Sequence, residues 1–170
     1  MRPAERDGLA LERHRGAGER PLGHHQLRGG ATALPRTLRL LRAPVAEISA
    51  DPIASAATLR AGTGATALLK GAATVIAGEE EITLNTTGCS GMATGGSGDV
   101  LTGLIAGLCA QGMPAYEAAS AGAWLHGRAG ELCARRFGQR AMTAADLLSF
   151  LPGALAEAER ENPVMISQTE

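Results

Sequence analysis

The chain has 170 residues, of which 45% are apolar and 2% aromatic, and it carries a formal net charge of -1. This length suits one domain with a buried core, whereas the near-neutral charge and the few aromatic rings argue against nucleic acid or a membrane surface as the partner. The three cysteines (Cys89, Cys109, Cys133) show no metal-binding spacing and no apolar run reaches the ~18 residues of a membrane span, so we expect a cytoplasmic protein with reduced thiols.

The first part of the chain differs in composition from the rest. Residues 1–36 mix arginine with glycine and proline and hold no apolar period for more than a turn, so we expect them to be disordered. A short amphipathic piece over 34–41 is predicted to end before Pro44, because proline disfavours helix in the residue that precedes it. Residues 37–160 are then predicted to form one domain, and residues 161–170, which lack any period, a tail.

A helix and three strands are predicted next. Asp51 followed by Pro52 is typical of a helix N-cap and first helical position, and the alanine-rich helix that they begin should stop at the glycines of 62–64. The apolar segment 65–70 is predicted to be a buried strand of the kind found in α/β sheets. A hairpin follows, with arms over 74–77 and 81–85 and a three-residue turn between them.

The second half of the chain is predicted to be helical. The three expected helices cover residues 98–110, 116–137 and 144–158. Small residues are frequent in the second helix, which implies close packing against the first. Thr143 and Asp146 resemble a capping box for the third helix, in which Pro152 should cause a kink or a break. The predicted fold class is therefore α/β.

The segment Gly88–Asp99, with the sequence GCSGMATGGSGD, runs directly into the first of these helices. A glycine-rich backbone can approach a ligand closely, and the unpaired amides at a helix start attract an anion. Asp99 would repel a phosphate held there. We therefore expect this carboxylate to act on a substrate beside the phosphate.

Lys70 is the only lysine in the chain and stands at the end of the predicted buried strand, before the small residues Gly71, Ala72, Ala73 and Thr74. Such a turn could line a nucleotide pocket, since α/β sheets bind ligands at strand ends, or it could be only a tight entry into the hairpin. The glycine segment nearby favours the pocket. Familiar phosphate motifs are absent, because Ser97 stands where a P-loop requires lysine and no G-x-G-x-x-G follows a strand.

Three segments resemble the motifs of a known family. Gly88–Gly103 (GCSGMATGGSGDVLTG) is similar to the signature of the ADP/ATP-dependent NAD(P)H-hydrate dehydratases, which belong to the ribokinase-like superfamily. Lys70–Ile76 (KGAATVI) resembles the family's second motif, and Leu125-His126-Gly127 with Ala129-Gly130 resembles the third. The resemblance extends from about residue 38 to about residue 156. It implies the C-terminal portion of a ribokinase-like three-layer α/β/α domain.

The resemblance also implies an activity and a set of site residues. The family repairs NADH or NADPH hydrated on the nicotinamide ring: ADP or ATP phosphorylates the ring hydroxyl, and phosphate is then eliminated. Asp99 would contact the hydrated substrate and act as the catalytic base, while Gly95, Gly96, Ser97 and Gly98 would form an anion hole. The residues expected to bind the nucleotide are Lys70, Gly71, Ala72, Ala73, Thr74 and Gly98. Mg²⁺ is expected to accompany the nucleotide.

Some features depart from the family pattern. Ala73 stands at a usual glycine and Cys89 at a usual asparagine, and residues 1–36 show none of the early strands or the His-Pro-Gly-Glu turn, as though out of register with the family. Two other functions therefore stay open: a small-molecule kinase acting on a sugar or pyrimidine, and a non-catalytic nucleotide-binding remnant. His126 is expected to be a core or subunit-contact histidine rather than a functional one. Small-residue helices and an incomplete sheet predict a homo-oligomer.

Overall fold

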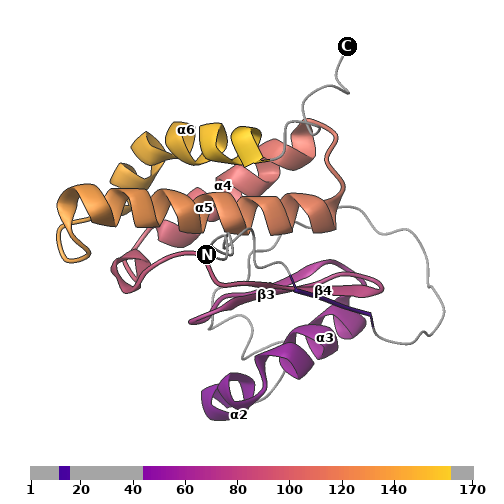
Figure 1. Ribbon diagram of the computed structural model, residues 1–170. Helices are drawn as coiled ribbons and strands as arrows, with labels where there is room; N and C mark the ends of the chain where they lie inside the picture. The colour runs from indigo at the N-terminus through magenta and orange to yellow at the C-terminus, as the bar shows by residue number, and fades with distance from the viewer. Residues whose placement is uncertain (1–11, 16–43, 162–170) are drawn as a thin grey trace, which may run out of the picture.

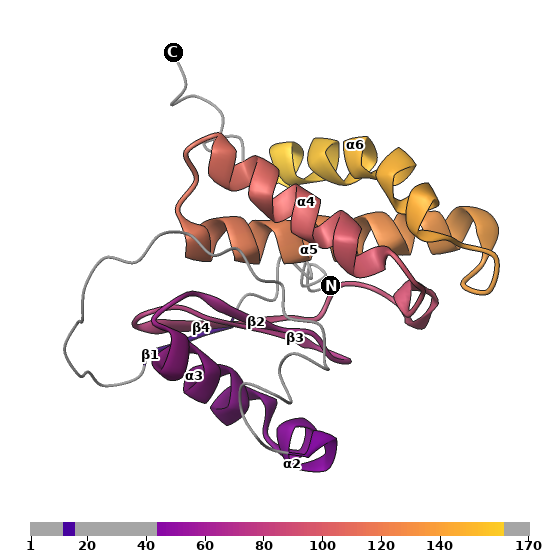
Figure 2. The ribbon, with the colours of Figure 1, turned by 180° about the vertical axis from the view of Figure 1, so that it is seen from behind.

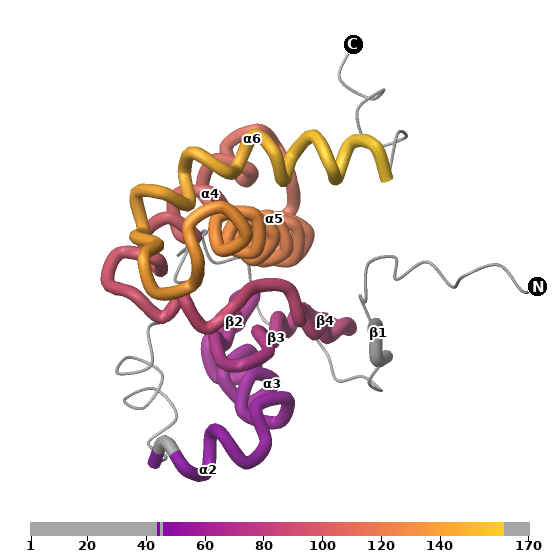
Figure 3. Tube along the Cα trace, turned by 60° about the vertical axis from the view of Figure 1, so that its left-hand side comes forward, coloured from indigo at the N-terminus to yellow at the C-terminus, as the bar shows by residue number. Residues whose placement is uncertain are grey.

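The computed structural model describes residues 12–15 and 44–161, which form a sheet between two layers of helices (Figure 1). Helices α2 (Val45–Ala50) and α3 (Pro52–Thr63) cover one face, and α4 (Ser97–Ala110), α5 (Ala115–Phe137) and α6 (Ala144–Glu161) lie beyond the other. Figure 2 shows the same arrangement from behind, and Figure 3 shows the sheet between the two layers. The predicted three-layer α/β/α class is confirmed.

The sheet has the order β1-β4-β3-β2, and its pairings are antiparallel. Its strands are β1 (Glu12–Arg15), β2 (Ala67–Leu69), β3 (Thr74–Ala77) and β4 (Glu81–Asn85). The predicted hairpin is β3–β4, closed by the amide of Gly78 donating to the carbonyl of Glu81 at 2.8 Å. β1 falls in the segment 1–36 that was expected to be disordered. The rest of that segment lies outside the described residues. The predicted piece over 34–41 and residues 162–170 of the tail also lie outside them.

Side chains of the strands alternate between two cores. Val75 and Ala77 pack with Ala56 and Leu59 of α3 on one face. Ile76 points to the other face, where it packs with Leu101 of α4. This period of two is what a sheet covered on both faces requires. The helical layer has its own apolar clusters, in which buried residues of α5 and α6 meet: Leu125, Ala129, Cys133, Leu147 and Ala154.

The helix boundaries follow the predicted caps. The Asp51 carboxylate accepts a hydrogen bond from the amide of Ala54 at 2.9 Å, and α3 ends at Gly64 with φ 68°. In the capping box before α6, the amide of Thr143 donates to the Asp146 carboxylate at 2.8 Å. The close packing predicted for α5 is confirmed, since a Cβ on Gly122 would lie 2.6 Å from Ile105 of α4.

Of the kink or break predicted for α6, the break is wrong, and one helix was not predicted. α6 continues through Pro152 as a single helix rather than breaking there. Proline removes the hydrogen bond to the carbonyl four residues earlier, and both Pro152 and Leu148 are exposed, so water can hydrate that carbonyl while Leu147 and Ala154 hold the helix in the core. The sequence did not predict α2, because its six residues are too few to show a helical period of apolar residues.

Candidate functional site

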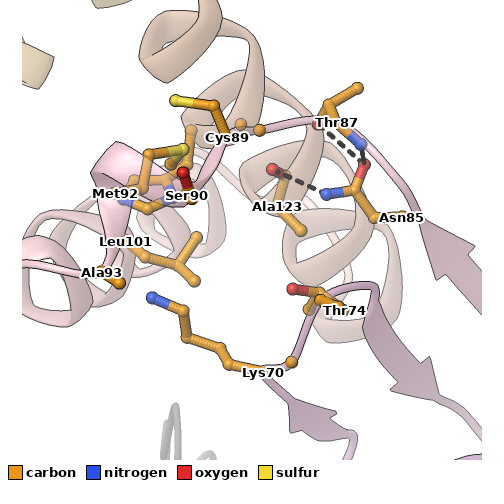
Figure 4. Close-up of a pocket in the computed structure, with 15 residues that line it drawn as sticks. Lys70, Thr74, Asn85, Thr87, Cys89, Ser90, Met92, Ala93, Leu101 and Ala123 are labelled. Carbon is orange, nitrogen blue, oxygen red and sulfur yellow. Dashed lines mark hydrogen bonds between the residues drawn. The ribbon is translucent and has the colours of Figure 1, made fainter. Parts of the chain in front are cut away.

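A cavity of about 560 Å³ lies where the ends of the strands meet α4 and α5. This volume is within the range of small-molecule sites. Its walls come from the β2–β3 loop, the end of β4 with the segment after it, the short 3₁₀ helix η1 (Ser90–Met92), α4 and α5. Figure 4 shows the side chains that line it. They are Lys70, Gly71, Ala72, Thr74, Asn85, Thr87, Gly88, Cys89, Ser90, Met92, Ala93, Leu101, Ala123, His126 and Gly127.

Lys70 supplies the positive charge of this cavity. It directly follows β2, and in Figure 4 its side chain extends across the space toward Ala93 and Leu101. Lys70 is exposed, but its ammonium group is partly desolvated by burial, and this lowers the pKa of Lys70. An anionic ligand would offset that desolvation. Lys70, the only lysine in the chain, therefore reaches across the cavity toward the side formed by Ala93 and Leu101.

The end of β4 is fixed to α5 by side-chain hydrogen bonds. The amide of Asn85 donates to the carbonyl of Ala123 at 3.2 Å. The Thr87 hydroxyl lies 2.9 Å from the Asn85 Oδ1 atom and 3.2 Å from the carbonyl of Trp124. Gly127 makes this approach possible, because a Cβ there would lie 2.6 Å from the carbonyl oxygen of Thr87. Strand and helix therefore form one rigid wall of the cavity.

An ion-pair chain extends this wall to α6. Gly88, with φ 120°, donates its amide to the Glu131 carboxylate at 3.0 Å. The other oxygen of Glu131 pairs with Arg128 at 2.5 Å, and Arg128 in turn pairs with Glu157 of α6 at 2.5 Å. Hydrogen bonds from the guanidinium lower the pKa of Glu157 and raise that of Arg128. Gly88, the first residue of the glycine segment, is thus held by Glu131 of α5 and, through Arg128, is linked to Glu157 of α6.

The glycine segment ends at the start of α4. Gly96 is the N-cap residue with φ 86°, and among the described residues no side-chain hydrogen bond caps the helix. The amides of Gly95, Gly96 and Gly98 donate no hydrogen bond to the described residues, whereas the amide of Ser97 donates to the carbonyl of Thr94 at 3.4 Å. Asp99, in the first turn, is exposed. Unpaired amides at a helix start are suited to bind an anion.

Ser97 is turned into the protein instead of toward solvent. It is 2% exposed, and its hydroxyl lies 3.3 Å from the Nε2 atom of His126, which is 3% exposed. The same Nε2 atom lies 2.9 Å from the carbonyl oxygen of Ser97. The pKa of His126 is lowered to about 4, because burial and, to a smaller extent, the positive charge of Lys70 outweigh the hydrogen bond to Ser97, which raises it. The imidazole is therefore neutral at pH 7.

The structure brings part of the predicted set together. Lys70, Gly71, Ala72 and Thr74 line the cavity, as expected for one binding surface. Two parts of the predicted set are not in the lining that the described residues form. They are Ala73, which is half-buried, and the residues from Gly95 to Asp99. The sequence did not single out Asn85, Thr87, Ser90 or Met92 as site residues. Ser90 and Met92 lie in the glycine-rich segment that the sequence marked, whereas Asn85 and Thr87 carry no local signal, because only the approach of α5 makes them part of a site.

His126 has the burial expected of a core histidine, yet it also lines the cavity. Its place in the third resembling motif was the one signal that pointed to it. Among the described residues no group of three or more His, Cys, Asp or Glu side chains could hold a metal ion. No helix described in the structure is long and apolar enough to cross a membrane.

Comparison with known proteins gives a consistent result. The family model of the NAD(P)H-hydrate dehydratases matches residues 37–153. Over 130 residues the chain is 50% identical to a bifunctional NAD(P)H-hydrate repair enzyme of Moorella thermoacetica, covering 76% of this chain and 24% of that protein. It is 46% identical over 123 residues to an ADP-dependent (S)-NAD(P)H-hydrate dehydratase of Neisseria meningitidis, covering 72% of this chain and 39% of that one.

Solved structures agree with the sequence matches. An ADP/ATP-dependent NAD(P)H-hydrate dehydratase from Bacillus subtilis, co-crystallised with ATP and Mg²⁺, superposes with a TM-score of 0.69 at 30% identity. The superposition covers 72% of this chain and 45% of that chain. The chain thus spans less than half the length of the relatives that it matches.

Proposed function

The chain belongs to the NAD(P)H-hydrate dehydratase family, and on this premise we propose that it acts in nicotinamide nucleotide repair. The proposed reaction is the ADP- or ATP-dependent dehydration of hydrated NADH or NADPH, in which the ring hydroxyl is phosphorylated and phosphate is then eliminated. The observation that carries the proposal is the cavity that Lys70 enters, beside the uncapped start of α4. A nucleotide supplies the phosphoryl group there.

The residues of the β2–β3 loop are proposed to bind the adenine nucleotide. Lys70 would pair with a phosphate, and Gly71, Ala72, Ala73 and Thr74 would present backbone and hydroxyl groups to the rest of it. The small side chains of this loop and the cavity volume of about 560 Å³ support such a fit. The free amide of Gly98 would contribute from the helix start.

Asp99 is proposed to be the catalytic base. Its carboxylate, exposed in the first turn of α4, would take the proton of the ring hydroxyl as that oxygen attacks the terminal phosphorus. The amides of Gly95, Gly96 and Gly98 would stabilise the charge that develops on the transferred phosphoryl group. Ser97 would contribute only its backbone, because its hydroxyl is directed at His126.

Mg²⁺ is proposed to arrive with the nucleotide. Since no described cluster of carboxylates could hold the ion, phosphate oxygens and water would be its main ligands, as is usual for this metal. The ion would neutralise phosphate charge, and the residues of this chain would bind and orient the nucleotide. We also propose a cytoplasmic location, which the three free cysteines support.

A homo-oligomer is part of the proposal. Leu148 and Leu155 are 55% and 41% exposed, and their spacing of seven residues places them on one face of α6. A contiguous exposed apolar patch marks a contact surface, and these two leucines would lie in it. Light scattering that gave the mass of a monomer at high concentration would overturn this part.

The experiment is an assay with hydrated NADH and ADP, followed by the absorbance of restored NADH. Turnover should require both compounds, and Asp99→Ala should lower the rate at least about 100-fold, the usual contribution of a general base. Glu159→Ala, a change in an exposed carboxylate of α6, is the control and should keep the wild-type rate. A rate for Asp99→Ala within a few fold of wild type would exclude the assigned base.

Calorimetric titration with ADP separates the dehydratase from a non-catalytic remnant, and product analysis separates it from a kinase. A non-catalytic remnant with a collapsed pocket would give no heat, and a kinase would accumulate a stable phosphorylated product. Lys70→Gln should weaken ADP binding about 10- to 100-fold, the value of a charged hydrogen bond. Arg140→Gln, at an exposed position outside the cavity lining, should leave the affinity unchanged.

A further inference from the structure

Ser97 and His126 form a buried polar contact between two helices of the site. Ser97 begins α4 and His126 lies in the middle of α5, 29 residues later. Both are almost fully enclosed, with exposures of 2% and 3%. Burying polar groups at this depth costs free energy unless they are hydrogen-bonded. The contact therefore has a defined geometry, which fixes the state of the imidazole.

The atom at the contact determines the tautomer. Nε2 of His126 lies 2.9 Å from the carbonyl oxygen of Ser97. A carbonyl oxygen can only accept, so Nε2 must carry the proton and donate it. Burial and the charge of Lys70 keep the ring neutral by lowering the pKa of His126 to about 4. In a neutral ring with Nε2–H, the Nδ1 atom holds a lone pair and is an acceptor.

Nδ1 is available to a ligand. In the described part of the chain this atom has no hydrogen-bond partner, and it is not sealed inside the protein, since the Ser120 hydroxyl is the one fully enclosed side-chain atom without a partner. His126 is 3% exposed and lines the cavity. Of the two ring nitrogens, Nδ1 is therefore the one left to meet a ligand bound in the cavity.

We propose that His126 is a positioning residue that links the cavity to the first turn of α4. Its Nε2–H holds the carbonyl of Ser97, which immediately precedes Gly98 and Asp99 in the chain, and its Nδ1 accepts a hydrogen bond from an N–H or O–H group of the bound nucleotide. The first contact depends only on the structure, whereas the second rests on the proposed function. A nucleotide that engages Nδ1 thus restrains the helix start that carries the catalytic base.

The tautomer can be measured by long-range ¹H–¹⁵N NMR on the wild-type chain at pH 7. Of the four histidines, the signals of His126 are those missing from the His126→Gln variant. The expected pattern is a protonated Nε2 and an unprotonated Nδ1 whose resonance moves upfield when ADP is added. An imidazolium or an Nδ1–H tautomer in the absence of ADP would overturn the assignment.

Two variants test the restraint on α4. His126→Gln keeps an N–H donor near the Nε2 position, and His126→Met has a similar size without a donor. In the methionine variant the amides of Asp99 and Val100, which donate to the carbonyl of Gly96 at 3.0 and 3.1 Å, should exchange with solvent about tenfold faster, as expected for the loss of one buried hydrogen bond. The glutamine variant should stay within about threefold of wild type.

The amide of Ile76 in β3 reports whether the fold is intact. Unchanged exchange at Asp99 and Val100 in His126→Met, with Ile76 still protected, would overturn the restraint. If His126→Met fails to fold, acceleration of the same amides in His126→Gln would overturn it, and wild-type rates there would support it. ADP binding in the calorimeter without a shift of Nδ1 would overturn the ligand contact. Absence of ADP binding would instead contradict the proposed function and this contact, while the Ser97 contact is still decided by the tautomer and the exchange rates.

Discussion

Lowering the pH from 7 to 5 should destabilise this protein through His126. The pKa of this group is about 4 in the folded state, because burial disfavours the imidazolium and the charge of Lys70 repels it, and it is 6.5 in an ordinary environment. Between these values the unfolded chain binds a proton that the folded chain does not. Stability from this group is therefore complete above about pH 6.5 and is lost as the pH falls toward 4.

The size of the effect follows from the two pKa values. At 1.36 kcal/mol per pKa unit the complete loss is about 3 kcal/mol, and about 2 kcal/mol of it should occur between pH 7 and pH 5. That is a large share of the 5–15 kcal/mol that typically stabilise a domain. Lys70→Gln removes the repelling charge, so this variant should lose less stability than wild type over the same range.

Urea denaturation at pH 7, 6 and 5, followed by circular dichroism, measures the free energy of unfolding. His126→Gln is the matched control, because its amide does not titrate while the other ionisable groups are shared with wild type. The difference between the two proteins should change by about 2 kcal/mol between pH 7 and pH 5. Parallel pH profiles would refute the reasoning, since they would mean that the imidazole takes up a proton in the folded protein as easily as in water.

Two predictions concern packing and capping. Gly127→Ala should lower the free energy of unfolding by about 1–3 kcal/mol, because the new Cβ would overlap Thr87; Gly107→Ala, with open space around the added Cβ in α4, should instead raise it by about 0.5–1 kcal/mol, and equal effects of the two in urea denaturation would contradict the packing argument. Asp51→Ala should cost about 1 kcal/mol by removing the cap of α3, and Asp51→Asn, which keeps an acceptor oxygen, should restore most of the loss.

Local chemistry explains why many elements could be predicted from the sequence. The Asp51 cap and the Thr143 capping box involve residues three positions apart, and the β3–β4 turn is closed between Gly78 and Glu81. These interactions join residues that are close in the sequence, so the residue types themselves mark them. The glycine segment before Asp99 likewise predicted the start of a helix, which is α4. The resemblance of its motif to a known family is confirmed by the family match.

The site itself depends on contacts between distant segments. Asn85 meets Ala123 across 38 positions, and His126 meets Ser97 across 29. Such pairs leave no periodic signal, so the role of Thr87 in the cavity wall and the tautomer of His126 could not be read from the chain. β1 also pairs with a strand far along the sequence, which no local pattern marks.

Pro152 shows how the two levels can disagree. Its residue type alone predicts a kink or a break, yet the helix is not broken, because the packing of α6 against α5 outweighs one missing hydrogen bond at an exposed position. By itself the sequence determined most of the helices and strands, α2 and β1 excepted, and which family motifs they carry. Only the tertiary structure decided which side chains share the cavity, because burial and hydrogen bonding between segments arise when the layers come together.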